Sequence, residues 1–482
     1  MNRASRFMMR QWAGLGARFL PFADAATPDL PLSRLLRLSL FQVAVGMALT
    51  LLIGTLNRVM IVELGVPASL VGAMIALPLL FAPFRAVIGY KSDHHRSELG
   101  WRRVPFIYRG AMLQFGGLAI LPFALLVLAR LGDSASAPAW VGQAAAALAF
   151  LLVGAGLHTV QTVGLALATD LAAPESRPKV VGLMYVMLLV GMIASALLFG
   201  AMLAEFTPGR LVQVIQASAL LTVVLIGVAA WKQEPRRSTA RVPQPVPPDF
   251  RTAFSSFLAG DRALNFLLVT GIGTMAFTME DVLLEPYGGQ VLGLAVGETT
   301  KLTATLAIGG IAGFGLASRV LARGYDPLRL ACIGVVLGIP AFAAVILAQP
   351  LDSILLFALG TAAIGAGAGL FGHGTLTATM NRAPRDQIGL ALGAWGASQA
   401  TAAGLGVALG GIIRDIVATT SNHAATGYHV VYGLEIVLLL VTLASAAPLL
   451  AAESRDAARS HAGRNQRGSP GGSGIIQEGS AL

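Results

Sequence analysis

The chain has 482 residues, of which 55% are hydrophobic and only 12% are charged. Soluble proteins carry about 25% charged residues, so this composition cannot cover a water-exposed surface. It excludes aqueous enzymes, nucleic-acid modules and disordered scaffolds, although the formal net charge of +10 is strongly basic. In a membrane protein, an excess of Lys and Arg marks the cytoplasmic loops. We therefore predict an all-α polytopic membrane protein.

Twelve stretches are apolar over about 20 residues, the length that crosses a bilayer as a helix. They are 35–63, 67–90, 104–130, 139–170, 179–205, 209–232, 263–286, 293–322, 327–348, 351–381, 386–414 and 429–451. The residues before the first span are too polar for the apolar region of a cleavable signal peptide. Basic residues gather before this span and in alternate loops, which predicts that both termini are cytoplasmic.

A connection rich in proline and arginine divides these spans into six and six, because proline at such density cannot continue a helix. The expected organisation is a basic amphipathic cytoplasmic segment (1–34), an N-terminal six-helix bundle (35–232), the cytoplasmic linker (233–262), a C-terminal six-helix bundle (263–452) and a disordered cytoplasmic tail (453–482).

Short strings repeat between the two bundles. Gly154-Ala-Gly-Leu157 in the fourth span matches Gly367-Ala-Gly-Leu370 in the tenth, and Gly54-Thr55 in the first matches Gly273-Thr274 in the seventh. The matches fall where a duplication would place them. They predict bundles related by a pseudo-twofold axis, with spans one, four, seven and ten facing their interface.

The loop after the second span carries Gly89, Asp93, Gly100, Arg102 and Arg103. This pattern resembles the signature loop of the major facilitator superfamily, lengthened by an insertion. Asp93 can pair with basic groups and with a helix N-terminus, which would latch the cytoplasmic helix ends together. The alternative is a solvated basic loop.

Ionisable side chains within the spans are costly unless they are paired. Arg58 lies near the outer end of the first span, with Glu63 five residues on, and the seventh span carries Glu280, Asp281 and Glu285. If both spans face a central cavity, Arg58 pairs with Glu280 or Asp281 across the two halves. The alternative is that all these groups lie at the outer interface and reach water.

Two histidines fall in spans otherwise devoid of charge. His158, with Gln161 nearby, is in the fourth span, and His373 lies between Gly372 and Gly374 in the tenth. Neutral imidazole is a good axial ligand for a metal in a macrocycle, and the glycines leave room for a flat ring. The alternative is a histidine hydrogen-bonded to a neighbouring helix. No catalytic motif accompanies these residues, so we expect no enzymatic activity.

Three long strings, Leu36–Gln42, Gly54–Leu64 and Ala82–Arg96, closely resemble the bacteriochlorophyll delivery family, the PucC- and LhaA-like light-harvesting complex assembly proteins of purple bacteria, within the major facilitator superfamily. The span-seven run Met279–Tyr287 is similar too. The resemblance implies two major-facilitator-like bundles and an assembly factor for the photosynthetic antenna. It would bind bacteriochlorophyll a transiently and hand it to antenna polypeptides, with light-harvesting 1 favoured over light-harvesting 2. The magnesium would be held by His158 or His373, our own assignment from chemistry, with Gln161 beside the first.

The resemblance also implies the partners and the compartment. The partners would be light-harvesting polypeptides, chlorophyll synthase, the reaction-centre core complex and membrane lipids, with no nucleic acid. The compartment would be the bacterial inner membrane and the intracytoplasmic photosynthetic membrane. Two alternatives stay open: a proton-coupled secondary transporter of a tetrapyrrole or other amphiphile, and a pigment-free scaffold that binds antenna helices laterally.

Overall fold

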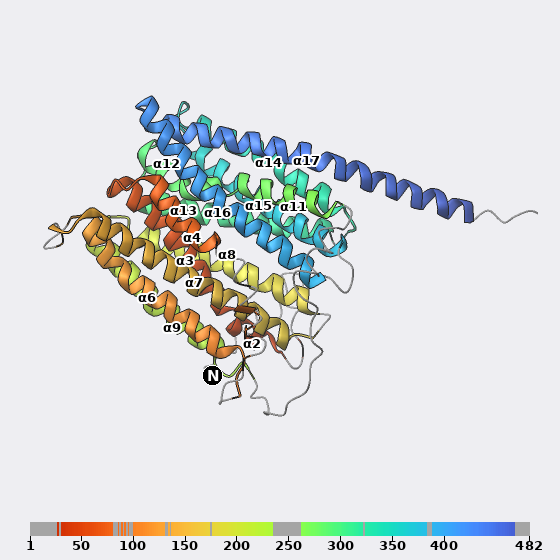
Figure 1. The fold of residues 1–482 in the computed structure, drawn as a ribbon, viewed down its shortest axis with the longest axis horizontal. Coiled ribbons are helices and arrows are strands. Elements are labelled where there is room, and N and C mark those ends of the chain that lie inside the picture. Colours follow the sequence, from red (N-terminus) through yellow and green to blue (C-terminus); the bar gives the residue numbers. More distant parts are fainter. Residues whose placement is uncertain are drawn as a thin grey trace, which may run out of the picture.

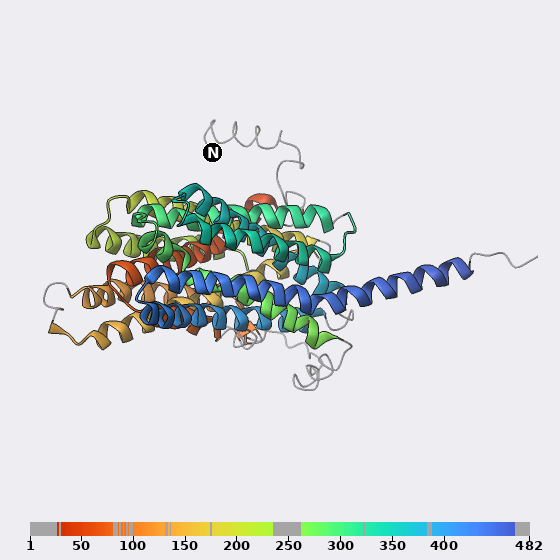
Figure 2. The same ribbon diagram turned by 90° about the horizontal axis from the view of Figure 1, so that it is seen from above.

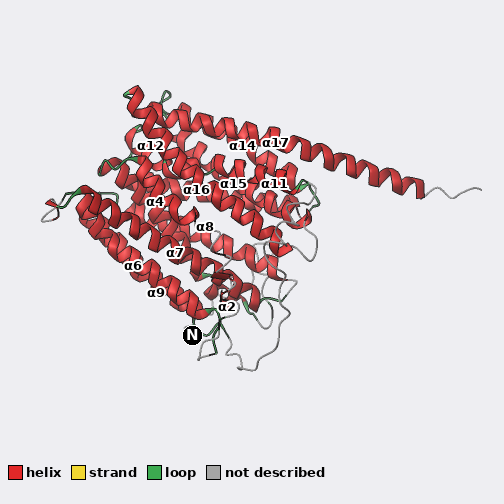
Figure 3. Ribbon diagram, viewed as in Figure 1, coloured by secondary structure: helices red, strands yellow, loops and turns green. Residues whose placement is uncertain are grey.

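A computed structural model describes most of the chain, and every regular element in the described ranges is a helix (Figure 3). The described residues are 27, 30–80, 85, 88–89, 91–92, 95, 100–130, 134, 136–173, 176–234, 262–321, 323–382 and 388–467. Within them, 11 helices are long and apolar enough to cross a membrane, and Ala68–Leu79 forms a shorter apolar helix. The predicted all-α polytopic fold is confirmed.

Within its described residues, the first half of the chain has five helical segments long enough to cross a membrane and the shorter helix α4 (Figure 1). The first is a continuous run of α2 (Leu32–Leu38), α3 (Leu40–Leu49) and the π-helical segments η2 (Thr50–Leu56) and η3 (Val59–Glu63). The others are α4 (Ala68–Leu80), α6 (Val104–Leu128), α7 (Ala139–Leu171), α8 (Arg177–Met202) and α9 (Pro208–Ala230). Proline in the first turn of α6, α8 and α9 suits a position whose N–H has no helical partner.

The second half forms six spans, and the first of them is broken. It consists of α11 (Ala263–Ala276), the 3₁₀ turn η6 (Met279–Val282) and α12 (Leu284–Gln290). The others are α13 (Val296–Leu321), α14 (Pro327–Ala348), α15 (Ile354–Arg382), α16 (Ile388–Ser421) and α17 (Ala424–Arg467). The sequence predicted a continuous span here. The break follows three threonines whose hydroxyls bond the carbonyl four residues back, an arrangement that bends helices: Thr270, Thr274 and Thr278.

Helix α17 differs from the expected disordered tail, because it continues as helix to Arg467 and projects beyond the bundle (Figure 2). Its final stretch, Ala451-Ala-Glu-Ser-Arg-Asp-Ala-Ala-Arg459, is rich in alanine and in charges of both signs, which favours helix. The proposed amphipathic segment up to residue 26, linker residues 235–261 and the tail after 467 lie outside the described residues.

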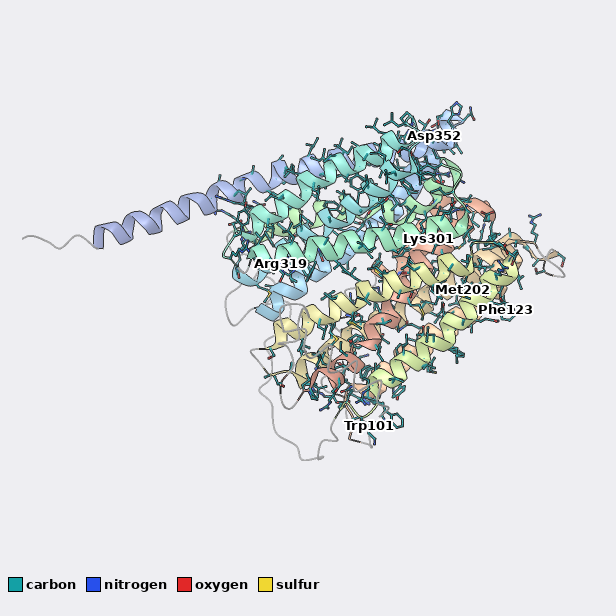
Figure 4. All side chains as sticks on the ribbon, turned by 180° about the vertical axis from the view of Figure 1, so that it is seen from behind. Trp101, Phe123, Met202, Lys301, Arg319 and Asp352 are labelled. Atoms are coloured by element: carbon teal, nitrogen blue, oxygen red, sulfur yellow. The ribbon has the colours of Figure 1, made fainter. Side chains whose placement is uncertain are left out.

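The most extensive contacts between the two halves are made by two helix pairs, α4 with α16 and α8 with α13. Glycines permit the approach: a Cβ added to Gly72 would lie 2.9 Å from the Val407 carbonyl oxygen, and one added to Gly200 would lie 2.8 Å from that of Gly297. Figure 4 shows Met202 and Lys301 at this meeting, whereas the helix ends near Trp101 and Arg319 spread apart. We call the end with Trp101 and Arg319 the basic end and the opposite one the far end.

Candidate functional site

At the basic end, both arginines of the predicted latch loop bind an acidic residue that sequence analysis did not single out. Arg102 Nη2 donates to Asp170 Oδ2 at 2.5 Å, and Arg103 Nε donates to the same oxygen at 2.6 Å. Asp170 lies in the last turn of α7, so the loop is tied to the helix that follows α6. Arg103 Nη1 also donates to Ser92 Oγ at 3.0 Å, and Ser92 Oγ donates to the Gly89 carbonyl oxygen at 2.8 Å.

The N-terminus of α6 is capped by the carboxylate of Glu234, the residue that precedes the undescribed linker. This carboxylate accepts from the backbone N–H groups of Arg102 (2.9 Å), Arg103 (3.0 and 3.1 Å) and Val104 (3.0 Å). Free N–H groups and the helix dipole make a helix N-terminus a favourable place for negative charge. Glu234 thus takes a role that the sequence assigned to Asp93, which lies outside the described residues.

Two glycines complete this loop. Gly100 has a φ of +76°, a left-handed conformation that glycine adopts without strain. Gly89 lies beside α7, where an added Cβ would be 3.9 Å from the Thr162 methyl group. The described part of the latch therefore joins helix ends within the first half of the chain.

At the far end, Arg58 is 3% exposed and its ionic partner is Glu63, not Glu280 or Asp281. Nη1 donates to Glu63 Oε1 at 2.9 Å, and Nη2 donates to the Leu294 carbonyl oxygen in the second half at 3.3 Å. Glu63 is reachable because it lies one wide π-helical turn further along η3. Burial of Arg58 also excludes the alternative that its side chain reaches water.

Three further hydrogen bonds join the two halves, and the one made by Asn57, the neighbour of Arg58, reaches span seven. They are the Asn57 Nδ2 to Asp281 carbonyl bond (3.0 Å), the Thr55–Thr300 hydroxyl pair (3.4 Å) and the Ser69 N–H to Asp415 Oδ2 bond (2.7 Å). All three lie toward the far end, so the halves are joined there by polar as well as apolar contacts.

The predicted carboxylates of span seven lie at or beside its break. Glu285 is 3% exposed and accepts a short hydrogen bond from the hydroxyl of Thr303. The position of Glu285 also explains why residue 54 is a glycine, since a Cβ added there would lie 2.5 Å from Glu285 Oε1. The first span therefore passes directly against this carboxyl group.

Glu280 has a neighbour that sequence analysis missed. Glu435 of α17 is 0% exposed and Glu280 is 1% exposed, whereas Asp281 is partly exposed. The three carboxyl groups are electrostatic neighbours. The available signal was a single acidic residue in the twelfth span, which is otherwise devoid of charge between Tyr428 and Leu450 except for a histidine.

His158 and Gln161 stand near an arginine of the second span. Arg85 Nη2 donates to Gln161 Oε1 at 2.6 Å and Arg85 Nε donates to Thr162 Oγ1 at 3.0 Å. The Gln161 oxygen is thus occupied and is a poor candidate for a pigment ligand. The Nδ1 atom of His158 is buried with no hydrogen-bond partner, and Arg85 is its charged neighbour.

His373 of α15 is in a different setting. Its Nδ1 atom is also buried without a hydrogen-bond partner, and its ring meets that of Phe314 edge-on, with centroids 4.2 Å apart. The preceding residue, Gly372, has nothing within 4 Å of an added Cβ. The two histidines come from corresponding spans of opposite halves, and the structure does not bring them into contact.

Most glycines near the histidines serve helix packing rather than a ligand groove. A Cβ on Gly154 would overlap the ring of Pro78, and one on Gly367 would lie 2.8 Å from the Gly334 carbonyl oxygen. Gly372 is the exception on α15. Among the described residues, no group of three or more His, Cys, Asp or Glu side chains could hold a metal ion.

This arrangement defines a major-facilitator-like membrane protein, and solved structures share the fold. A bacterial homologue of the human lysosomal transporter Spinster matches with a TM-score of 0.65 and 16% identity, over 86% of this chain and 95% of its own. A mutant form of the nucleoside transporter NupG matches with a TM-score of 0.65 and 15% identity, over 86% of this chain and 99% of its own.

The chain belongs to the PUCC protein family, whose model matches residues 55–454. It is 61% identical to Protein PucC of Rhodovulum sulfidophilum over 420 residues, 86% of this chain and 92% of that protein. It is 58% identical to Protein PucC of Rhodobacter capsulatus over 452 residues, 92% of this chain and 98% of that protein. A protein of the same organism described as lying in the puhA–bchM intergenic region is 50% identical over 450 residues, 92% of this chain and 94% of that protein.

Proposed function

We propose that this protein is an assembly factor for photosynthetic light-harvesting antenna, and that it binds bacteriochlorophyll and passes it to antenna polypeptides. Membership of the PUCC family supports the antenna role. A more distant relative, 32% identical over 88% of this chain and 97% of its own length, is named as a bacteriochlorophyll synthase 44.5 kDa chain of Rhodobacter capsulatus, which supports a link to the pigment.

The observation that carries the pigment site is the imidazole of His373. A buried ring nitrogen without a partner costs free energy unless something binds the ring. A neutral imidazole can donate electrons to the magnesium of a chlorin, and open space beside Gly372 leaves room for a flat macrocycle. His158 offers the same chemistry in the other half. Arg85, bonded to two neutral oxygens, would place a positive charge near a polar substituent of the pigment.

The transfer we propose is passive. The chain binds the pigment at a histidine, excludes water with the surrounding apolar helices, and releases it to an antenna helix of higher affinity. No step requires enzymatic chemistry. The antenna served is proposed to be light-harvesting 1 rather than light-harvesting 2, as the sequence favours.

The setting we propose is the bacterial inner membrane and its photosynthetic invaginations, with both termini and the basic end in the cytoplasm. The two bundles would be residues 35–232 and 263–452, joined by a linker at 233–262. Antenna polypeptides, chlorophyll synthase and the reaction-centre core are the proposed partners.

A near-infrared spectrum of the protein, purified in mild detergent from cells that make bacteriochlorophyll but lack antenna polypeptides, tests the proposal. We expect a stoichiometric pigment band that is lost in the H158F/H373F double variant and weakened in one of the single variants. His423→Phe is the matched control, because His423 lies exposed at the far end. A colourless wild-type protein, or a double variant that keeps its pigment, would contradict pigment binding.

A proton-coupled transporter of a tetrapyrrole or other amphiphile is the second candidate. It is favoured by the buried carboxyl groups of Glu280 and Glu285, because intramembrane carboxyls often relay protons. It predicts gradient-dependent flux of the amphiphile in proteoliposomes, which passive transfer would not show.

A pigment-free scaffold is the third candidate. It is favoured by a groove of about 390 Å³ on the outer face of the first half, lined by Arg37, Val223, Val224, Gly227, Val228 and Trp231. An apolar antenna helix could lie there. This candidate predicts that V224W blocks co-purification of antenna polypeptides while the histidine variants do not.

A further inference from the structure

The break in span seven is enclosed by three other spans. Asn57 of the first span donates to the Asp281 carbonyl oxygen at 3.0 Å. On α16, a Cβ added to Gly410 would lie 2.9 Å from the Met279 carbonyl oxygen. Helix α17 also packs on η6 and brings Glu435 to it. The break is therefore buried inside the second half and in direct contact with the first.

The carboxyl groups at this break have no cation to pair with among the residues that the structure describes. Arg58 is engaged by Glu63 and the Leu294 carbonyl. Arg414 of α16 is engaged by Asp415 (2.9 Å), Gln290 (2.5 Å) and the Tyr428 hydroxyl (3.3 Å). The other titratable groups that face the cluster are acidic or neutral. They are Glu285 and Tyr287 of α12, and Tyr428, His429 and Tyr432 of α17.

Several polar atoms around the cluster lack hydrogen-bond partners within the described part of the chain. They are Glu280 Oε2, both carboxyl oxygens of Glu435, Asn57 Oδ1 and the Tyr432 hydroxyl. The Tyr432 side chain is 0% exposed, and its hydroxyl is an electrostatic neighbour of both Glu435 and Glu280. This hydroxyl, which has no hydrogen-bond partner among the described residues, is placed to share a proton with the two carboxyl groups.

Two buried carboxylates side by side, with no cation beside them among the described residues, would cost several kcal/mol each. A bound proton removes one charge and creates an O–H donor for the neighbouring oxygens. A multivalent metal fits less well, because no group of three ligating side chains suitable for a metal occurs among the described residues. We propose that Glu280, Asp281 and Glu435 form a proton-binding site at the break of span seven, with the Tyr432 hydroxyl as a further partner.

Proton binding at this site has a route from the surface, and it affects the contact between the two halves. Asp281 is the member of the site with some exposed surface, and we place the entry of protons beside it. The backbone carbonyl oxygen of Asp281 accepts the hydrogen bond from Asn57 of the first half. Loss of the proton leaves like charges in a dry cluster, and their repulsion displaces η6 and weakens this contact between halves. Protonation thus favours the closed far end, whether or not the cargo is a pigment.

Infrared spectroscopy of the purified protein tests the site directly. A protonated carboxylic acid has a carbonyl stretching band above the amide I band, and this band shifts in D₂O. We expect it in the wild-type protein at neutral pH, and we expect it to weaken in E435Q and in E280Q. Glu205→Gln is the control, because the Glu205 side chain is 84% exposed at the far end and lies outside the buried cluster.

Two results would overturn the proposal: absence of the band at neutral pH, or a band unchanged in both E435Q and E280Q. A band that appears only when choline replaces Na⁺ would show that the cluster binds a metal cation instead. The conformational consequence is tested by the spin-label distance between Trp140→Cys and Leu355→Cys in a Cys332→Ser background. It should lengthen at alkaline pH, and should stay constant in E280Q/E435Q; a distance independent of pH in the parent would contradict the coupling.

Discussion

Asp170 and Arg103 form an ion pair in which Arg103 Nε lies 2.6 Å from Asp170 Oδ2. The same oxygen accepts a hydrogen bond from Arg102 Nη2. The Arg103 side chain is 6% exposed and the Asp170 side chain 33% exposed. One acidic residue near the end of α7 therefore pairs with both arginines of the loop before α6, and one of the two arginines is held out of water.

Removal of this acidic residue should destabilise the first half. Because Asp170→Asn removes an ionic partner of the largely buried Arg103 guanidinium, we expect a loss of about 1–3 kcal/mol. R102Q should cost less, since the Arg102 side chain is more exposed, at 21%. Thermal unfolding in detergent measures both. Equal effects of the two variants would show that the burial of Arg103 does not matter.

Glu234→Ala should fray the start of α6, because three backbone N–H groups lose their acceptor and the helix dipole loses its anion. Loss of a cap of this kind costs about 1–2 kcal/mol. Hydrogen exchange of the amides at 102–106 should accelerate. The exposed Glu205→Ala serves as control, and slow exchange retained in Glu234→Ala would argue against the cap.

The glycines of α13 allow a direct comparison. A Cβ on Gly309 would overlap the Ala362 carbonyl oxygen, whereas one on Gly315 has nothing within 4 Å. We therefore expect G309A to lower stability by about 1–3 kcal/mol through forced separation of α13 and α15. G315A in the same helix should be neutral or slightly stabilising. Thermal unfolding of the two variants tests this expectation. Similar unfolding temperatures for G309A and G315A would contradict the close approach of α13 and α15.

Glu63→Gln should loosen the far end, because Arg58 then keeps only neutral acceptors while it remains buried. With Glu63 itself 36% exposed, we expect a loss of about 1–2 kcal/mol. R58Q should weaken the contact with Leu294 as well, and so should change proteolytic access to the connection before α13 more than Glu63→Gln does. A larger change in proteolytic access in Glu63→Gln than in R58Q would mean that the ion pair, and not the link between the halves, protects this connection.

The sequence predicts the spans well because apolar length is a local property. The boundaries of α14 match the expectation, and those of most other spans differ by a few residues. The break of span seven was missed, because threonines that bond back to their own helix look like any other polar residue in a sequence.

The site was predicted less completely, because its contacts join distant residues. The sequence singles out Arg102, Arg103 and Glu280, but not their neighbours Asp170, Glu234 and Glu435, which are far away in the sequence. Arg58 was expected to reach across to the second half with its charge. Instead the wide turn of η3 brings a nearer carboxylate within reach, and only a backbone carbonyl is contacted across the interface.

Gln233 and Glu234 are consecutive, and each fastens a different helix: Gln233 holds Arg34 at the start of the first span, and Glu234 holds the start of α6. The connection to the second half leaves directly from this joint. A mechanical load on that connection is therefore carried by the bases of three helices at once instead of by the end of α9. The first half would yield to such a load as a rigid block, not by unravelling its last helix.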